Sequence, residues 1–141
     1  MNNTAASAAA SLPRNFSVFS KATGLVIDTV NATEVTAHAD LGIDHHTPWG
    51  VIHGGVYTSL IESVGSVGAS YAVLERKQYA VGVHNATDFL RPSKKALVSI
   101  KGTALFQGRT QQLWEVVITD QATGKELARG QLRTQNIPMP N

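Results

Sequence analysis

The stretch GVYTSLIESVGSVGASYAVLE, residues 55–75, has the longest helical periodicity in the chain. Its apolar residues recur at spacings of four and three, the pattern of a helix packed on a flat surface. The pattern predicts a helix of about 20 residues, roughly 30 Å long. The predicted buried stripe consists of Val56, Leu60, Val64, Val67, Tyr71 and Leu74.

The other side of this predicted helix carries Thr, Ser, Ala and one carboxylate. Glu62 is the only formally charged residue between His53 and Leu74, whereas a solvated helix face normally carries many charged residues. We therefore expect a second subunit or a ligand to cover this face, and Gly65 and Gly68 favour such close approach. The alternative is that the small residues only let the helix lie close to a sheet.

A covered carboxylate at Glu62 would need a partner or a chemical role, because an unpaired buried charge costs several kcal/mol. Positions 58, 59, 65 and 66, one turn away, offer no cation, and an ion pair with a distant Arg stays open. At the helix start, Gly54 and Gly55 leave backbone N–H groups free at the positive end of the helix dipole. Such a helix start can bind an oxyanion. The alternative is that the two glycines only allow the chain to turn into the helix.

Strand patterns lie on both sides of this helix. A hairpin of residues 24–30 and 34–40, then a turn-rich loop over 41–50, comes before it. Because short connections favour antiparallel pairing, the later strands are expected to form a meander. The prediction is an α+β domain with a short helix over 16–22, later strands at 79–91, 96–107, 111–120 and 126–136, and a tight turn over 122–125.

Length and composition limit the classes of protein. The 141 residues, 43% of them hydrophobic, suit a single domain over 16–141 after a loose tail, residues 1–15. With no cysteine, disulfides, thiolate zinc sites and cysteine nucleophiles are excluded. A net charge of +2 is too small for a nucleic-acid surface. Without a secretory signal or an apolar span, we expect a cytoplasmic protein that binds neither nucleic acid nor membrane.

His53-Gly54-Gly55, followed after six residues by Glu62, resembles the H-G-G-x6-E/D signature of hotdog-fold acyl-CoA thioesterases. The resemblance is to the branch with the Glu-type 4-hydroxybenzoyl-CoA thioesterases and the phenylacetate-pathway thioesterases. Trp49-Gly50 precedes the signature, and NATDFLRP, residues 85–92, looks like the family's strand that ends in an Arg-Pro turn. The similarity covers roughly residues 24–135.

The resemblance implies a hotdog fold, in which an antiparallel sheet wraps one long helix, and a homodimer or homotetramer with active sites between subunits. It implies that Glu62 attacks the thioester carbonyl or activates water, that the Gly54 N–H polarises the carbonyl, and that His53 shapes this end of the site. Ser66 matches a hydroxyl that steers water or the carboxylate. A carboxylate, an oxyanion donor and water suffice to hydrolyse a thioester without metal or cofactor, CoA being part of the substrate.

One position departs from that branch. Thr47 stands where relatives often have Gln or Asn near the thioester, so positioning of water or thiolate falls to Thr47 itself or to His46. For the CoA moiety, the resemblance implies contacts from Arg91, Arg109, Thr110 and Asn85. Arg side chains suit phosphate, although the cations, Lys94 and Lys95 included, can also be a solvated rim.

Three functions follow as expectations. The first is hydrolysis of an acyl-CoA, with an aryl-CoA favoured by the resemblance. The alternatives are a non-catalytic protein that binds or senses CoA esters, and an enoyl-thioester hydratase on the same fold. His45, His46 and His53 do not have the spacing of a metal site, and no Gly-x-Ser-x-Gly elbow or P-loop is present.

Overall fold

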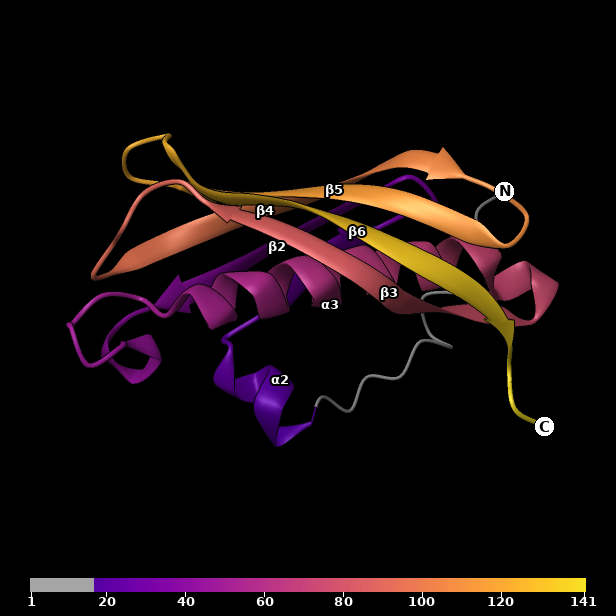
Figure 1. Ribbon diagram of the computed structural model, residues 1–141, viewed down its shortest axis with the longest axis horizontal. Coiled ribbons are helices and arrows are strands. Elements are labelled where there is room, and N and C mark those ends of the chain that lie inside the picture. Colours follow the sequence, from indigo (N-terminus) through magenta and orange to yellow (C-terminus); the bar gives the residue numbers. More distant parts are fainter. Residues whose placement is uncertain (1–16) are drawn as a thin grey trace.

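A long helix, α3 (Gly54–Val73), runs along one side of an antiparallel sheet, with the short helix α2 (Val18–Ala22) beneath it (Figure 1). This computed structural model describes residues 17–141, so the predicted tail 1–15 lies outside the described residues. The strands are β1 (Val26–Val30), β2 (Glu34–Leu41), β3 (Gln78–Phe89), β4 (Ala96–Gln107), β5 (Gln111–Asp120) and β6 (Glu126–Pro138). Short 3-10 helices, η1 (Ile43–His45) and η2 (Leu74–Arg76), lie in the connections.

The predicted α+β class and the elements themselves are confirmed. The helix ends two residues before the predicted limit because η2 follows it, and Lys77 then takes a left-handed conformation with φ 54°. The turn predicted over 122–125 is closed by the side chain of Asp120, which accepts from the Ala122 N–H and the Thr123 hydroxyl. Gly124 completes it with φ 73°. Local turn and cap signals therefore located these boundaries.

The prediction of a four-strand meander was wrong. The sheet order is β1-β2-β4-β5-β6-β3, so β3 pairs with β6 at an edge, and β4 pairs with β2. The connection between β3 and β4, residues 90–95, crosses the ends of β6 and β5. Three strand spacings amount to roughly 14 Å, which six residues can span at about 3.3 Å each. A connection of that length does not force its two strands to be neighbours.

The predicted buried stripe of α3 was also displaced around the helix. Leu60 and Val64 are buried as expected, but the rest of the buried face consists of Tyr57, Ile61, Gly65, Gly68, Ala69 and Val73. The two glycines face the sheet: a Cβ atom on Gly65 would lie 2.8 Å from Leu132, and one on Gly68 would lie 2.5 Å from Trp114. The plainer alternative for these glycines is therefore correct, because they let the helix approach the sheet.

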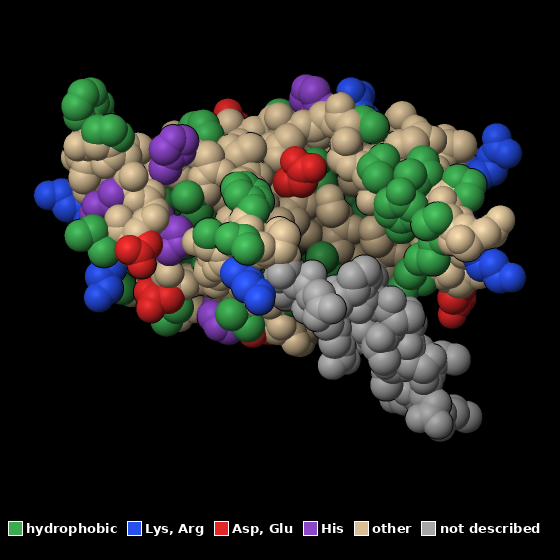
Figure 2. All heavy atoms as spheres, turned by 90° about the horizontal axis from the view of Figure 1, so that it is seen from below, with side chains coloured by type: hydrophobic (Ala, Val, Ile, Leu, Met, Phe, Trp, Pro, Cys, Tyr) green, Lys and Arg blue, Asp and Glu red, His purple; other side chains and the backbone are tan. Residues whose placement is uncertain are grey.

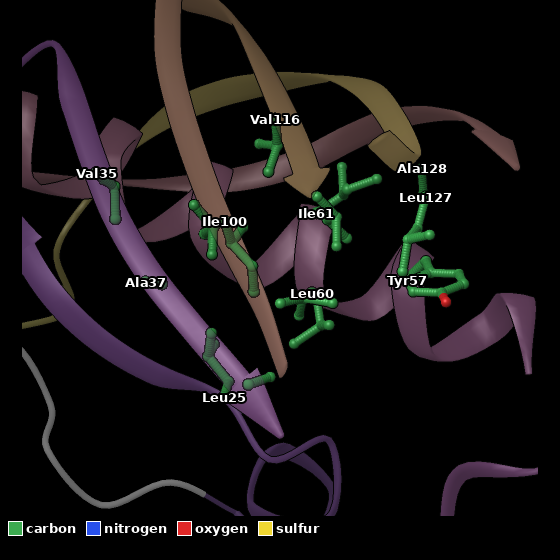
Figure 3. Packing of buried hydrophobic residues seen from close by; sticks show 14 of the residues in the cluster. Leu25, Val35, Ala37, Tyr57, Leu60, Ile61, Ile100, Val116, Leu127 and Ala128 are labelled. Carbon is green, nitrogen blue, oxygen red and sulfur yellow. The ribbon is translucent and has the colours of Figure 1, made fainter. Parts of the chain in front are cut away.

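The core lies between α3 and the sheet. Leu60 and Ile61 on the helix meet Ile100 of β4 and Val116 of β5, all at most 1% exposed (Figure 3). The indole of Trp114, 0% exposed, fills the space above Gly68. This packing fixes the rotation of α3, and so determines which of its residues face away from the sheet.

Replacing Gly68 by alanine is expected to lower the free energy of unfolding by about 2 kcal/mol. The new methyl group would overlap the Trp114 ring, and overpacking of this kind exceeds the gain of about 1 kcal/mol from alanine's higher helix propensity. Urea denaturation measures the effect. Gly42→Ala is the control, since nothing lies within 4 Å of a Cβ there. A Gly68→Ala protein as stable as the parent would contradict the close packing.

Among residues 17–141, no helix combines the length and the hydropathy that crossing a bilayer requires.

Candidate active site

A small hairpin-like loop holds the start of α3. His46 and Ile52 form an isolated β-bridge, and the Thr47 N–H donates to the Val51 carbonyl at 2.7 Å. The Ile52 N–H then donates to Ser93 O at 2.8 Å, which ties the loop to the connection between β3 and β4. These hydrogen bonds hold the loop together and attach it to the β3–β4 connection. They therefore fix the position of the first residue of α3.

The first turn of α3 leaves one backbone donor free. The His53 Nδ1 atom accepts from the Gly55 N–H at 2.8 Å, and the His53 carbonyl accepts from the Val56 N–H at 3.0 Å. The Gly54 N–H has no hydrogen-bond partner among residues 17–141. Because helix N-terminal amides carry the positive end of the dipole, this N–H can stabilise a negative oxygen. The role predicted for Gly54 as an oxyanion donor stays a prediction.

The missing side chain at Gly54 also has a packing reason. A Cβ atom there would lie 3.0–3.3 Å from ring atoms of Phe89, the last residue of β3. The Phe89 ring itself is 58% exposed. The helix start therefore lies against the end of an edge strand, next to an aromatic ring that a ligand can reach.

A cavity of about 450 Å³ adjoins this helix start, between α2, η1 and the first two turns of α3. Its lining includes Phe19, His45, His46, His53, Val56 and Ser59. His45 and His46 donate from Nε2 to the carbonyls of Ala22 and Lys94, at 2.8 and 2.6 Å. These two histidines thus tie the loop to its surroundings, and the described residues contain no cluster of three His, Cys, Asp or Glu side chains able to hold a metal.

Glu62 lies on the flank of α3 beside the edge strand β3, where its carboxylate comes close to Gly82. Its side chain is exposed, and none of the ion pairs among residues 17–141 involves it. Seen from the helix side, the middle of the molecule shows mostly backbone and uncharged polar side chains (Figure 2). Nothing in the described part of the chain covers Glu62, so the expected cover can come only from another molecule or from the N-terminal residues.

The hydroxyl groups beside Glu62 differ in their contacts. Ser59 donates to the Gly55 carbonyl at 2.7 Å, and Ser70 exchanges hydrogen bonds with the backbone of Ala80, accepting from its N–H at 3.0 Å. Ser66, four residues after Glu62, is half-buried and has no hydrogen bond among the described residues. Ser66 lies one helical turn from Glu62, and the role that the resemblance implies for it stays a prediction.

Two predicted site residues lie in local structural contacts. Asn85 of β3 donates to the Thr58 carbonyl at 3.2 Å and accepts from the Thr87 hydroxyl at 2.7 Å, so it links the edge strand to α3. The Thr47 hydroxyl accepts from the Trp49 N–H at 3.2 Å within the loop. No contact within the chain brings Thr47 to Glu62.

The predicted CoA contacts lie at opposite ends of the molecule. Arg91 follows Phe89 near the start of α3, where its guanidinium donates to Glu126 O at 2.7 Å. Arg109 and Thr110 lie past the other end of the helix, where the Arg109 carbonyl accepts from Arg76 at 3.3 Å. About twenty residues of helix, roughly 30 Å, separate the two groups. One chain therefore does not place them around a single phosphate.

The Glu126 carboxylate, near Arg91, already interacts with another arginine. A side-chain hydrogen bond from Arg129, and to a smaller extent the charges of Arg129 and Arg91, lower the pKa of the half-buried Glu126 carboxyl. Arg91 donates only to a backbone carbonyl there, so it forms no carboxylate ion pair among the described residues. Its remaining N–H groups are free to bind a phosphate.

Tyr57 is a buried titratable group in the first turn of α3. Burial, with a smaller contribution from the charge of Asp120, raises its pKa to about 12. The ring packs beside Leu127 and Ala128 in the core (Figure 3), and its hydroxyl has no partner among the described residues. It stays protonated at neutral pH and faces away from Glu62.

Gly82, in the edge strand β3, is the site residue that the sequence reading missed. A Cβ atom on Gly82 would lie 2.9 Å from Glu62 Oε1. A glycine inside a strand pattern signals a bulge or a close approach, and that signal was present at position 82 of the segment predicted as strand 79–91.

Comparisons with known proteins show the fold and the family of the chain. "Putative esterase Rv1847" of Mycobacterium tuberculosis is 46% identical over 91 residues, a match that covers 62% of this chain and 64% of that protein, less than two thirds of its length. The solved structure of that protein superposes with a TM-score of 0.82 at 36% identity and covers 87% of this chain and 98% of that one. The structure of AziG from S. sahachiroi gives a TM-score of 0.82 at 30% identity over 89% and 100% of the two chains.

A third relative carries a more specific name. The 1,4-dihydroxy-2-naphthoyl-CoA hydrolase of Listeria monocytogenes is 29% identical over 98 residues, or 70% of this chain and 79% of that protein. Residues 50–127, which include the helix start, Glu62 and Arg91, match the sequence profile of the Thioesterase superfamily. The sheet wrapped around one long helix is thus a hotdog fold, and the chain belongs to the Thioesterase superfamily.

Proposed function

We propose that this protein is a cytoplasmic acyl-CoA thioesterase that hydrolyses its substrate to a free acid and CoA. The observation that carries the proposal is the combination, on one helix, of an unpartnered Gly54 N–H and an exposed Glu62 carboxylate without a cationic partner in the described chain. Membership of the Thioesterase superfamily supports the reaction class. The naphthoyl-CoA hydrolase among the relatives supports a CoA ester, and an aryl acyl group in particular.

These groups suffice for the chemistry. The Gly54 N–H stabilises the oxyanion that forms when the thioester carbonyl is attacked. The Glu62 carboxylate either attacks the carbonyl carbon, giving a mixed anhydride that water then cleaves, or removes a proton from the attacking water. In both routes the C–S bond breaks, the thiolate of CoA leaves and water supplies the new carboxylate oxygen. Ser66 holds the water or the carboxylate.

The spacing of Gly54 and Glu62 requires two chains for each site. Glu62 is eight positions after Gly54 on the helix, a rise of about 12 Å along the axis. An oxyanion donor and an attacking group must both lie about 3 Å from the same carbonyl group. We therefore propose that His53, Gly54 and Thr47 of one subunit face Glu62 and Ser66 of another.

The edge strand favours such a homodimer. Among the described strands β3 pairs only with β6. Its exposed apolar side chains include Val83 and Phe89, at 51% and 58%, and Leu90, directly after the strand, is 46% exposed. An unpaired edge with apolar side chains is a template for strand pairing. A second copy against β3 and the outer face of α3 would cover Glu62, as the sequence predicted, and two such dimers can form a homotetramer.

Removal of the Arg91 side chain is expected to raise KM for CoA thioesters about tenfold or more, with little change for a truncated N-acetylcysteamine thioester. Arg91 lies beside the helix start, and Arg binds phosphate through charge-assisted hydrogen bonds that only full CoA can accept. Steady-state kinetics of Arg91→Ala with both substrates measures this. Arg109→Ala, measured with the same two substrates, tests whether Arg109 and Thr110, at the other end of α3, bind CoA phosphate. Equal effects on both substrates would remove Arg91 from the phosphate site.

The proposed activity is tested with a panel of aryl-CoA and fatty acyl-CoA esters and detection of the released thiol, using the parent protein and Glu62→Gln side by side. We expect thiol release by the parent alone, fastest with aryl esters. A parent protein that binds these esters without releasing thiol would instead support a CoA-ester sensor.

A further inference from the structure

Gly82 provides the space in which the end of the Glu62 side chain lies. A Cβ atom at Gly82 would be 2.9 Å from Glu62 Oε1 and 3.4 Å from Glu62 Cδ. Real Cβ atoms do not approach a heavy atom as closely as 2.9 Å, so no other amino acid fits beside the carboxylate as it stands. The carboxylate occupies the room that a side chain at position 82 would otherwise fill.

The backbone does not explain this glycine. Gly82 is absent from the described residues with positive φ, which are Gly24, Gly50, Lys77 and Gly124. Any residue can therefore adopt its conformation, and glycine in a strand interior weakens the strand. The close approach of Glu62 is the contact that a side chain at position 82 would disturb.

An irregularity of the strand follows immediately. Gly82 pairs with Thr134 and His84 pairs with Arg133, which leaves Val83 as an extra residue in β3. Bulges of this kind bend a strand, and they often re-aim backbone or side chains next to active sites. The bulge and the glycine therefore shape the part of β3 that faces the carboxylate.

We propose that Gly82 is a positioning residue, which sets the place of the Glu62 carboxylate by leaving room for it against the edge strand. The proposal rests on the catalytic role proposed for Glu62. No ion pair within the described chain holds this carboxylate, so the surface of β3 at Gly82 limits where it can lie. A side chain at position 82 would push the carboxylate away from its place without touching the substrate.

Gly82→Ala should fold normally, because the nearest atom belongs to the free end of a flexible side chain and Leu132 Cδ1 is at an ordinary 3.4 Å. We expect kcat to fall about tenfold to hundredfold, since displacement of a reacting group by about 1 Å has effects of that size. KM should stay within about twofold and the melting temperature within about 2 °C. A merely structural role would change the melting temperature and leave kcat near the parent value.

Glu62→Asp supplies the partner for a double-mutant cycle. Its carboxylate is one methylene shorter and does not reach the space beside Gly82, so Gly82→Ala should lower kcat no further in that background. Gly130→Ala is the matched control. A Cβ there would also be crowded, but by Ile61 and the Ala86 carbonyl at 3.0 Å, so its effect should add to that of Glu62→Asp. Additive effects of Gly82→Ala and Glu62→Asp would overturn the proposal.

A spectroscopic measurement makes the test independent of catalysis. The Glu62 carboxyl resonance, identified in a ¹³C spectrum by its loss in Glu62→Gln, should change in chemical shift in Gly82→Ala and keep its position in Gly130→Ala. If the parent protein hydrolyses no CoA ester, the proposed function fails. The spectrum then tests by itself whether Gly82 positions the Glu62 carboxylate. An unchanged Glu62 resonance in Gly82→Ala, or an unchanged kcat, shows that Gly82 does not position the carboxylate.

Discussion

Glu62→Gln is expected to lower kcat for thioester hydrolysis by at least about 10³-fold, because the amide can neither attack a carbonyl nor take a proton from water. Glutamine has nearly the same shape, so the space beside Gly82 stays filled. The side chain is exposed and makes no ion pair in the described chain, so the melting temperature should hardly change. Thiol release under saturating substrate measures kcat, and calorimetric titration with CoA measures binding.

Glu75→Gln is the matched control, since Glu75 is an exposed carboxylate on η2, beyond the end of the same helix. We expect its kcat to equal that of the parent protein. Binding of CoA should survive in both variants. A Glu62→Gln protein that turns over within about threefold of the parent would remove Glu62 from the reaction, and with it the carboxylate mechanism.

The parts of the fold that depend on neighbouring residues could be predicted. The beginning of α3 follows from His53-Gly54-Gly55, and the turn after β5 follows from Asp120 and Gly124. Sheet order could not be predicted in this way, because the connection at residues 90–95 is long enough to cross two strands. Which strands then become neighbours depends on packing across the whole molecule.

The orientation of α3 shows a second limit. The sequence reading weighted Val56 and Val67 as buried because they are apolar, yet the structure turns Gly65 and Gly68 toward the sheet. A hydrophobic pattern does not mark glycine as a buried residue. In the structure, however, the Trp114 ring occupies the space that Gly68 leaves by having no side chain. For the same reason Gly82 was not predicted as a site residue. Its importance depends on its contact with the side chain of Glu62, twenty positions away in the sequence.

The residues of the candidate site could be named from the H-G-G-x6-E spacing, but their arrangement could not. The spacing places Gly54 and Glu62 on one helix, about 12 Å apart along its axis, but it does not show which groups lie opposite each of them. Arg91 and Arg109 likewise share a charge and lie at opposite ends of α3. If each chain carries two half-sites, as proposed, mixing two inactive variants tests the assembly.

Gly54→Pro is expected to lower kcat about 10²–10³-fold, as loss of one oxyanion donor does elsewhere. Proline lacks the N–H but suits the first position of a helix. It also needs an extended residue before it, and His53 has φ −64° and ψ 131°. Gly54→Ala is the matched control, because it crowds Phe89 equally and keeps the N–H. If the alanine variant loses as much activity as the proline variant, the N–H is not the oxyanion donor.

Mixing Glu62→Gln with Gly54→Pro is expected to restore activity that neither variant has alone. In a heterodimer, one site combines the intact Gly54 of the first variant with the intact Glu62 of the second, and the other site has both defects. Random re-pairing makes half of the dimers mixed, so about a quarter of the parent activity should return in a two-fold symmetric assembly. Native mass spectrometry confirms the mixed dimers. Mixed dimers without activity would mean that each chain acts on its own substrate. The distance of about 12 Å between Gly54 and Glu62 would then have to be closed by bending of α3. The close packing of Gly65 and Gly68 on the sheet opposes such bending.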